Sequence, residues 1–436
     1  MANKNLPKLS LLFFIIIIAL ISSISNMIPP KLATISLFFG FGGDTFPLGV
    51  LTSIFTIVSG FAMLIFGYLS DKFVRKWIII IGALLFATFS TLTIIIFPGF
   101  GGFLIFFIFA IIMGIGYGAL IPSSFSLTAD IVSEEDRSKG FSFFSIASLF
   151  GIVLGNGLAA FASDWRTSFW IIGIAGLITT FFLASVKEPS RIGLNHSNLN
   201  PEENRVIYPY RIKRSDLPII FKKKANFWLI INFVDTIPTG IIIFLLYEYM
   251  LNYHGISSDI TLFFLLFILL ATLVGTVVFG YLGDKWFGKG NQKARVKLAL
   301  YGNILPIPFI FIALIIPFHT PDIFPGIVIW VALMMIGIFL NGAVNGNWYA
   351  TVVDLNLPEH RGTVLATSNF FDIIGRSIGP VIGAITADTL GFVFGMMISI
   401  FFWMLIPLFW IGVIKNVVPE MEQTAKTFDQ RLQKIT

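Results

Sequence analysis

Long apolar runs, separated by glycine, proline and charged residues, set the pattern of this chain. A helix of roughly 20 apolar residues crosses the hydrocarbon core of a bilayer and satisfies its backbone polar groups internally. The runs therefore predict an all-α polytopic membrane protein. The predicted helices form two sets of six, at residues 9–32, 47–69, 77–98, 102–126, 140–162 and 166–186, then 226–250, 260–282, 296–318, 326–350, 362–387 and 391–414.

A single long hydrophilic connection, Lys187 to Ala225, separates the two sets of helices. It predicts an N-terminal six-helix bundle at residues 1–186 and a C-terminal bundle at 226–418. Residues 187–225 then form a cytoplasmic central loop, and residues 419–436 form a cytoplasmic tail.

The composition agrees with a membrane protein. Hydrophobic residues make up 56% of the chain and charged residues 12%, whereas soluble domains carry roughly 25% charged residues. The chain has no cysteine, which excludes disulfides, thiolate metal sites and thiol nucleophiles. Its histidines lack metal-ligand spacing and no nucleophile and base are paired, so we expect neither an enzyme nor a cofactor or metal site.

Lysine and arginine positions predict the orientation, because these residues are enriched in cytoplasmic loops. With both termini cytoplasmic, only Lys31 and Arg166 fall in loops on the other side, and Arg376 lies within a predicted helix. We predict an even number of crossings of the cell membrane. The net charge of +6 lies in loops, where it suits anionic lipid headgroups rather than nucleic acid. We expect a monomer in contact with membrane lipids.

The two halves repeat one another. Residues Phe66–Lys72 recur as Phe279–Lys285. A second set of matches has a constant offset and pairs Asp130 with Asp354, Arg137 with Arg361, Gly151 with Gly375, Gly155 with Gly379, and Asp164 with Asp388. Duplicated six-helix units are a construction of secondary transporters, which bind substrate between the halves.

The stretch from Gly67 to Lys76, which reads Gly-Tyr-Leu-Ser-Asp-Lys-Phe-Val-Arg-Lys, resembles the loop 2–3 motif of the major facilitator superfamily. The resemblance implies twelve helices in two pseudo-symmetric six-helix bundles and transport by alternating access. The first half is also similar in layout to spinster-type lipid transporters. Where those carry an acidic residue in helix 1 and an arginine and a glutamate in helix 4, this chain has Ser25, Ala110 and Tyr117.

The superfamily resemblance also implies a conformational gate at the ends of the helices. Small residues in it let helices approach closely, and charged residues form contacts that water can replace when the carrier opens. The alternative is a solvated turn that merely ends a helix. The predicted gate residues are Gly67, Asp71, Arg75, Asp130, Arg137, Gly280, Asp284, Asp354 and Arg361.

Ionisable residues within predicted helices are costly to insert and point to function. Asp372 and Arg376 lie four residues apart on one helix face, where they can pair, and Asp235 is placed to share Arg376 by analogy with the superfamily. The alternative is a structural ion pair. For Glu248, near a helix end, the alternative to a functional role is a side chain that snorkels to the interface, and this interpretation is favoured. Further candidates for binding or coupling are polar and aromatic: Asn232, Asn341, Asn345, Trp348, Tyr117 and Asn26.

Together these features predict a secondary active transporter that moves a small organic solute by alternating access. Coupling to protons or another ion is one form of this hypothesis. The alternatives are an uncoupled facilitator or a lipid or lysolipid transporter of the same fold, and a membrane receptor that does not transport.

Overall fold

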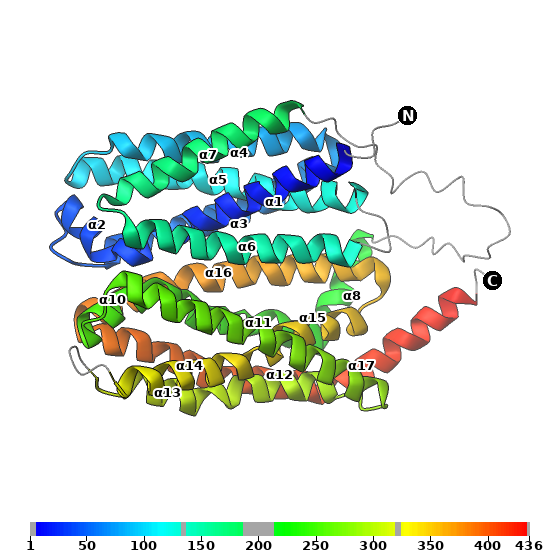
Figure 1. Cartoon of the computed structure of the whole chain (residues 1–436). Helices are drawn as coiled ribbons and strands as arrows, with labels where there is room; N and C mark the ends of the chain where they lie inside the picture. The colour runs from blue at the N-terminus through cyan, green and yellow to red at the C-terminus, as the bar shows by residue number, and fades with distance from the viewer. Residues whose placement is uncertain (1–5, 132–136, 186–212, 319–323, 434–436) are drawn as a thin grey trace. The chain divides into compact units, whose positions relative to one another are not determined.

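The computed structural model describes residues 6–131, 137–185, 213–318 and 324–433, and all regular structure in these ranges is helical (Figure 1). Side chains at 6–11, 71–72, 125–131, 137–146, 185, 214, 358–359, 362 and 432 lie outside the description, so the predicted gate residues Asp71, Asp130 and Arg137 do too. Contacts divide the chain into two compact units. Unit 1 comprises Met1–Leu199, Ile243–Leu262 and Pro380–Phe392, and unit 2 comprises Asn200–Ile242, Phe263–Gly379 and Val393–Thr436.

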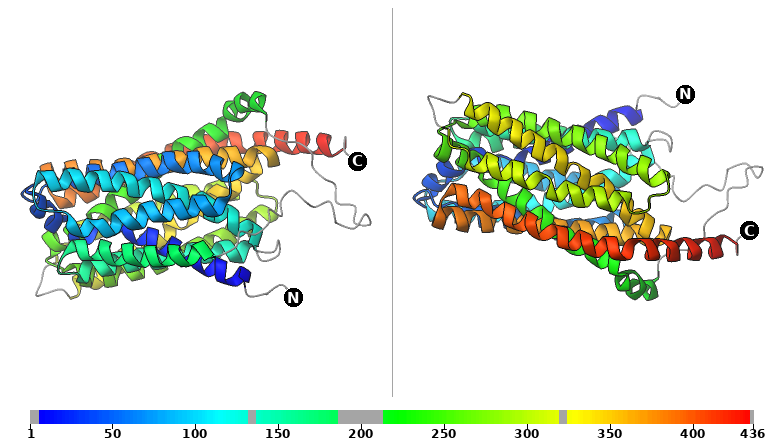
Figure 2. Two further views of the ribbon diagram at one scale, coloured as in Figure 1. Left: turned by 90° about the horizontal axis from the view of Figure 1, so that it is seen from above. Right: turned by 90° about the horizontal axis from the view of Figure 1, so that it is seen from below.

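Unit 1 is built mainly from the helices of the first half of the chain. Helix α3 packs along α5, α4 packs on α5 and α7, and α1 packs on α6 (Figures 1 and 2). The helices are α1 (Leu6–Ile24), η1 (Pro29–Lys31), α2 (Leu32–Phe39), α3 (Phe46–Lys72), α4 (Arg75–Leu92), η2 (Thr93–Ile95), α5 (Phe100–Ile131), α6 (Arg137–Phe161) and α7 (Trp165–Ser185).

Two glycines on α6 explain its close approach to α1. A Cβ at Gly151 would lie 2.7 Å from Ser22 Cβ, and a Cβ at Gly155 would lie 2.7 Å from the backbone of Ser23. No larger residue fits without moving a helix backbone. Four residues separate the glycines, which is the small-x-x-x-small spacing of close helix crossings in membranes.

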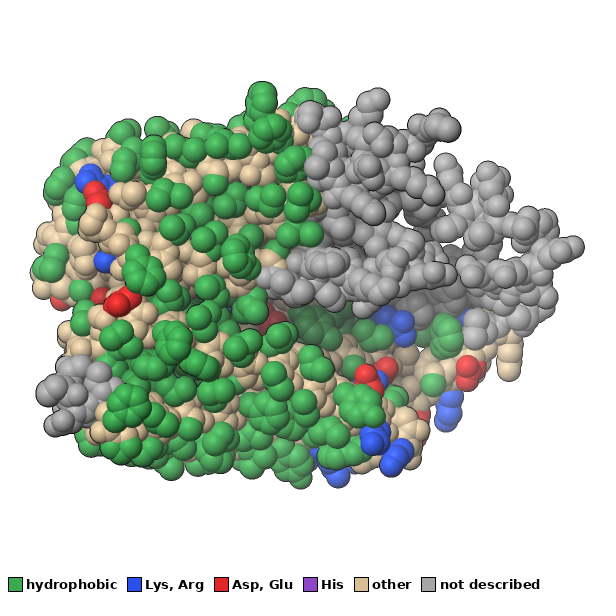
Figure 3. Space-filling view, in the orientation of Figure 1, with side chains coloured by type: hydrophobic (Ala, Val, Ile, Leu, Met, Phe, Trp, Pro, Cys, Tyr) green, Lys and Arg blue, Asp and Glu red, His purple; other side chains and the backbone are tan. Residues whose placement is uncertain are grey.

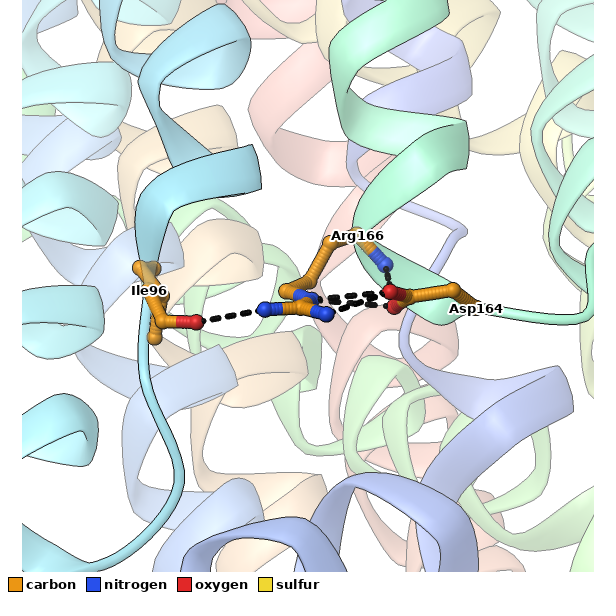
Figure 4. A network of polar contacts seen from close by, with 3 residues as sticks. All are labelled: Ile96, Asp164 and Arg166. Carbon is orange, nitrogen blue, oxygen red and sulfur yellow. Dashed lines mark hydrogen bonds and ion pairs between the residues drawn. The ribbon is translucent and has the colours of Figure 1, made fainter.

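Polar contacts fix the start of α7. Asp164, in the turn before the helix, accepts hydrogen bonds from Arg166 Nη2 at 2.6 Å and from the backbone N of Arg166 at 3.0 Å. Arg166 Nη1 donates to the Ile96 carbonyl at 2.8 Å (Figure 4). The Arg166 side chain therefore ties the turn before α7 to the end of η2 and holds the pKa of Asp164 below its usual value.

Unit 2 contains most helices of the second half. Helix α13 packs on α14, and α12 packs on α15. Two helices are divided between the units. Helix α10 belongs to unit 2 up to Ile242 and helix α16 up to Gly379, and the rest of each helix belongs to unit 1. The helices are η5 (Arg214–Asp216), α8 (Leu217–Lys222), α9 (Lys224–Ile231), η6 (Asn232–Asp235), α10 (Thr236–His254), α11 (Ser258–Gly288), α12 (Ala294–Ile304), α13 (Pro306–Ile315), α14 (Gly326–Asn341), α15 (Ala343–Leu355), α16 (Pro358–Leu390) and α17 (Phe392–Leu432).

The helices have the length and composition that membrane crossing needs. Among the described residues, 11 helices, some with a break, are long and apolar enough to cross a bilayer. The twelfth predicted crossing coincides with α6, which is 25 residues long and apolar from Ala147 to Phe161. Hydrophobic side chains cover most of the described surface in the space-filling view (Figure 3). The predicted all-α polytopic fold is confirmed.

Helix α17 continues through residues that the sequence pattern assigns to a tail, and it projects beyond its neighbours (Figure 2). Its Glu420 carboxylate accepts hydrogen bonds from the backbone N of Lys224 and Ala225, at 2.8 and 3.1 Å, at the start of α9. Thr424 Oγ1 donates to the Leu355 carbonyl at 2.9 Å. The first part of the expected tail is therefore a packed element of unit 2.

Candidate functional site

A break in a membrane-crossing helix marks the candidate site. Between α9 and α10 the backbone tightens into the 3₁₀ turn η6, and Pro238 soon afterwards lacks the N–H of a regular helix. Mid-helix 3₁₀ turns often mark functional hinges, and interrupted helices hold the binding sites of many transporters. Within η6, Asn232 Nδ2 donates to Asp235 Oδ2 at 2.9 Å. The Asn232 Oδ1 atom is buried and accepts no hydrogen bond from the described residues.

Helix α16 crosses this break at close range. A Cβ at Gly375 would lie 2.5 Å from the Phe233 carbonyl oxygen, and one at Gly379 would lie 2.6 Å from the Ile237 carbonyl oxygen. Thr236 Oγ1 donates to the Asp372 carbonyl at 2.9 Å. The crossing therefore sets the backbone of Asp372 beside the first residue of α10.

Three charged side chains gather at the crossing: Asp235, Asp372 and Arg376, named here the acidic cluster. The charges of Asp372 and Arg376 both act on Asp235. The Arg376 side chain is exposed and, within the described part of the chain, forms no ion pair with Asp372 within 4 Å. Since two carboxylates face one guanidinium, the cluster has one negative charge in excess when all three are ionised.

Helix α15 contributes the neutral polar edge of this site. The charges of Asp372 and Arg376 also act on Tyr349, which places this ring beside the acidic cluster. Tyr349 Oη donates to Asn369 Oδ1 at 3.1 Å. The sequence patterns did not single out Asn369, because a lone amide on an otherwise ordinary helix gives no signal before its partner is known.

Of the remaining candidates of the second half, two form hydrogen bonds between helices and one is exposed. Asn341 Nδ2 donates to the Gly302 carbonyl at 3.3 Å, and Trp348 Nε1 donates to the Leu229 carbonyl at 3.3 Å. Asn345 is exposed. Of these three, only Asn345 keeps its side chain available to a solute.

The candidates of the first half lie in unit 1. Asn26 Nδ2 donates to the Ser22 carbonyl at 2.8 Å, and the ring of Tyr117 packs edge-on against Phe55 at 5.8 Å. A small cavity of about 20 Å³ is bordered by Ser25 and Ala110 and otherwise mostly by apolar side chains. The described part of unit 1 thus has no counterpart of the acidic cluster at this position.

The predicted gate residues of the second half form a charge network in unit 2. Arg295 at the start of α12 forms ion pairs with Asp284, at 2.6 Å, and with Asp354. Arg361 Nε donates to the carbonyls of Val353 and Asn356, at 3.0 and 3.2 Å. The sequence patterns missed Arg295, because it lies in a run of cations at residues 285–297 that reads as an ordinary cytoplasmic loop.

The other gate residues behave differently. The Arg75 side chain is buried in unit 1. A Cβ at Gly67 would touch Pro122 only at an ordinary 3.8 Å, and one at Gly280 would meet no atom within 4 Å. Neither glycine lies at a close helix contact within its own unit, and their role in the gate stays a prediction.

The interpretation of Glu248 as a snorkelling side chain is wrong. Its residue is only 3% exposed, and its carboxylate accepts a hydrogen bond from the backbone N of Ala33 at 2.8 Å. A long acidic side chain near a helix end reads as interfacial in sequence. The partner lies far away along the chain and only the fold brings it close.

Comparisons with known proteins agree with this architecture. The sequence matches the family model described as the Major Facilitator Superfamily over residues 10–380 and 228–436. Protein spinster of Drosophila melanogaster is 31% identical over 157 residues, which cover 35% of this chain and 25% of spinster. The matched part of the chain thus spans about a quarter of the length of that relative.

Two solved structures share the fold. The crystal structure of a bacterial homolog to human lysosomal transporter spinster, in an inward-facing and unoccupied conformation, aligns with a TM-score of 0.77 at 14% identity, over 96% of this chain and 99% of that one. The D-xylose-proton symporter aligns with a TM-score of 0.72 at 17% identity, over 94% and 99% of the two chains. The predicted fold, twelve helices in two six-helix bundles, is confirmed.

Proposed function

Since the chain belongs to the major facilitator superfamily, we propose that it is a secondary active transporter that couples the movement of a small organic solute to protons through the acidic cluster. The observation that carries the proposal is the excess carboxylate of the cluster beside the broken helix η6. Burying a charge without a partner is costly, and a bound proton removes the cost. Asp235 and Asp372 therefore provide a place where one proton binds and leaves.

The residues around the cluster indicate what kind of solute it accepts. Arg376 is an exposed cation at the crossing, and Asn345 is an exposed amide one turn before Tyr349. The buried Asn232 Oδ1 atom still accepts no hydrogen bond from the described chain. A solute with an anionic or strongly polar group for Arg376, a hydrogen-bond donor and an apolar ring or chain for Tyr349 would satisfy these groups.

Reconstitution tests this proposal. Purified protein in liposomes with an imposed pH gradient is screened against organic acids, amino acids, sugars, organic cations and lysolipids. For the transported solute, we expect Asp372→Asn or Asp235→Asn to reduce proton-driven accumulation at least about tenfold, the factor that one pH unit of driving force supplies. Solute exchange without a gradient persists, because neither substitution removes the binding surface.

The matched control is Asp429→Asn, the same substitution at an exposed position near the end of α17. It should leave accumulation unchanged. If both cluster variants accumulate solute as the unmodified protein does, coupling through this cluster is refuted. If solute flux is the same with and without the pH gradient in every variant, an uncoupled facilitator is favoured. If only lysolipids are transported, a lipid transporter is favoured.

A further inference from the structure

Two carboxylates from the second half of the chain cap helices of the first half within unit 1. Glu248 on α10 accepts a hydrogen bond from the backbone N of Ala33, in the first turn of α2, at 2.8 Å. Asn252 Nδ2 donates to the same carboxylate at 2.9 Å. The residue before α2, Lys31, provides no side-chain cap. Glu248 therefore satisfies one of the backbone N–H groups that a helix start leaves without a partner.

Asp388 on α16 does the same for α3. Its carboxylate accepts hydrogen bonds from the backbone N of Thr45 at 3.0 Å, from Thr45 Oγ1 at 2.8 Å and from the backbone N of Phe46 at 2.9 Å. Just beyond, a Cβ at Gly49 would lie 2.9 Å from the Pro380 carbonyl oxygen. We call Glu248, Asp388 and the starts of α2 and α3 the capping end of unit 1.

The two carboxylates differ in their access to water. Asp388 is exposed, so solvent stabilises its charge together with the donors of α3. Glu248 is 3% exposed and is held by two neutral donors. Within the described residues it forms no ion pair. A buried carboxylate without a cation is far less stable ionised than protonated, unless water reaches it.

Four other titratable groups near the capping end interact in two pairs. On α10 itself, His254 Nε2 and Tyr249 Oη lie 3.0 Å apart in a hydrogen bond. On η1 and α11, Lys31 and Asp259 interact electrostatically. Burial and the two hydrogen bonds, from Ala33 and Asn252, dominate the environment of Glu248.

We propose that Glu248 is a proton-binding site that controls opening of the capping end. With its proton bound, the neutral acid stays buried and α10 remains packed on α2. When the proton leaves to bulk water, the carboxylate gains more from hydration than from its two donors, and α10 moves away from α2. By the predicted orientation this end faces outward, so a proton taken up from outside closes it. This inference rests on the proposed proton-coupled transport.

The absence of cysteine makes a direct test possible, because an introduced thiol is the only thiol in the chain. Thr261→Cys reports opening. Thr261 is 1% exposed on α11, one turn after Ser258, whose Oγ donates to the Pro30 carbonyl at 3.0 Å. Ser257→Cys, at an exposed position one turn earlier, is the reference. The ratio of maleimide labelling rates at the two positions cancels the ordinary effect of pH on thiol reactivity.

We expect this ratio, measured in lipid nanodiscs, to rise severalfold between about pH 5 and about pH 8, because the ionised carboxylate favours the open state. With Glu248→Gln, which is neutral at every pH and whose amide oxygen can still accept the hydrogen bond from the backbone N of Ala33, the ratio should stay low and flat. Glu248→Asp still titrates and should retain a rise with pH. Asp388→Asn weakens only the cap of α3, so it should raise the ratio at every pH and keep the slope.

A flat ratio in the otherwise unmodified chain, or a Glu248→Gln variant that keeps the slope, overturns the proposal. The first of these outcomes needs no change at Glu248, so the test does not depend on the folding of that variant. Labelling needs neither a solute nor a gradient. A chain that shows the predicted slope but no proton-driven flux therefore supports the role of Glu248 while refuting the proposed function of the acidic cluster.

Discussion

A glycine-to-alanine substitution should lower stability at Gly375, where α16 crosses the η6 break, and raise it at Gly280, where the added Cβ has space. Gly375→Ala places a Cβ 2.5 Å from the Phe233 carbonyl oxygen and 3.0 Å from the Phe233 ring. Both neighbours are fixed by the crossing, so the helices must separate, at a cost of about 1–3 kcal/mol. Alanine recovers about 0.5–1 kcal/mol of backbone entropy relative to glycine in a helix. The net expectation is a loss of about 1–2 kcal/mol of stability.

Gly280→Ala is the matched control, because a Cβ there meets no atom within 4 Å. This variant should be more stable than the parent by about 0.5–1 kcal/mol, since alanine loses less backbone entropy on folding than glycine and meets no steric obstacle here. Thermal unfolding in detergent, followed by tryptophan fluorescence, compares the two variants with the parent. Gly375→Ala should also weaken proton-driven flux, because separation of the helices moves Asp372 away from Asp235. If Gly375→Ala unfolds at the same or a higher temperature than Gly280→Ala, the close crossing is refuted.

A second prediction concerns the turn before α7. Asp164→Asn should lower stability by about 0.5–1 kcal/mol, a charge-assisted contact discounted because both side chains are partly exposed, and thermal unfolding measures it. Because Arg166 lowers the pKa of Asp164, the carboxylate stabilises the fold fully at neutral pH, and this contribution disappears as the pH falls through the lowered pKa. The difference between Asp164→Asn and its parent should therefore shrink in acid, and a constant difference would contradict the assignment.

The sequence was sufficient to predict the helices because the length of an apolar run, and the glycine, proline and charged residues that end it, act on local structure. The runs of apolar residues predicted the crossing helices, and polar composition separated the two halves. The same locality explains the failures. Residues 217–222 lie within the stretch assigned to the hydrophilic connection, and residues 420–432 lie within the stretch assigned to the tail. They nevertheless form α8 and the end of α17. Glu248 and Arg295 have partners on other elements, and no spacing rule along the chain identifies such partners.

The internal repeat predicts the position of a charged residue better than it predicts the group that this residue binds. Asp164 and Asp388 occupy matching positions, but Asp164 binds Arg166 two residues away, while Asp388 caps α3. Duplication therefore preserves a carboxylate near the end of a helix, and later substitutions decide what it binds. A role can be transferred from a residue of one half to its counterpart in the other half only when both the repeat position and the contacts of the two residues agree.

The repeat also suggests a test of whether the charges of the acidic cluster are functional or structural. The α1–α6 and α10–α16 crossings both rest on a pair of repeated glycines, at 151 and 155 and at 375 and 379. In the same register, Asp372 corresponds to Ser148 and Arg376 to Ile152. The first crossing packs without charge, so packing alone does not require the roughly 2.5–3.5 kcal/mol that each embedded charge costs.

It follows that Asp372→Ser with Arg376→Ile, which installs the residues of the first crossing in the second, should fold normally. Size-exclusion behaviour and thermal unfolding measure this, and we expect stability close to that of the parent, because one carboxylate and one guanidinium are removed together and the net charge of the cluster does not change. Proton-driven flux should be lost in the same protein. If the double variant instead unfolds or aggregates, Asp372 and Arg376 hold the helices together, and the cluster is a structural element rather than a coupling site.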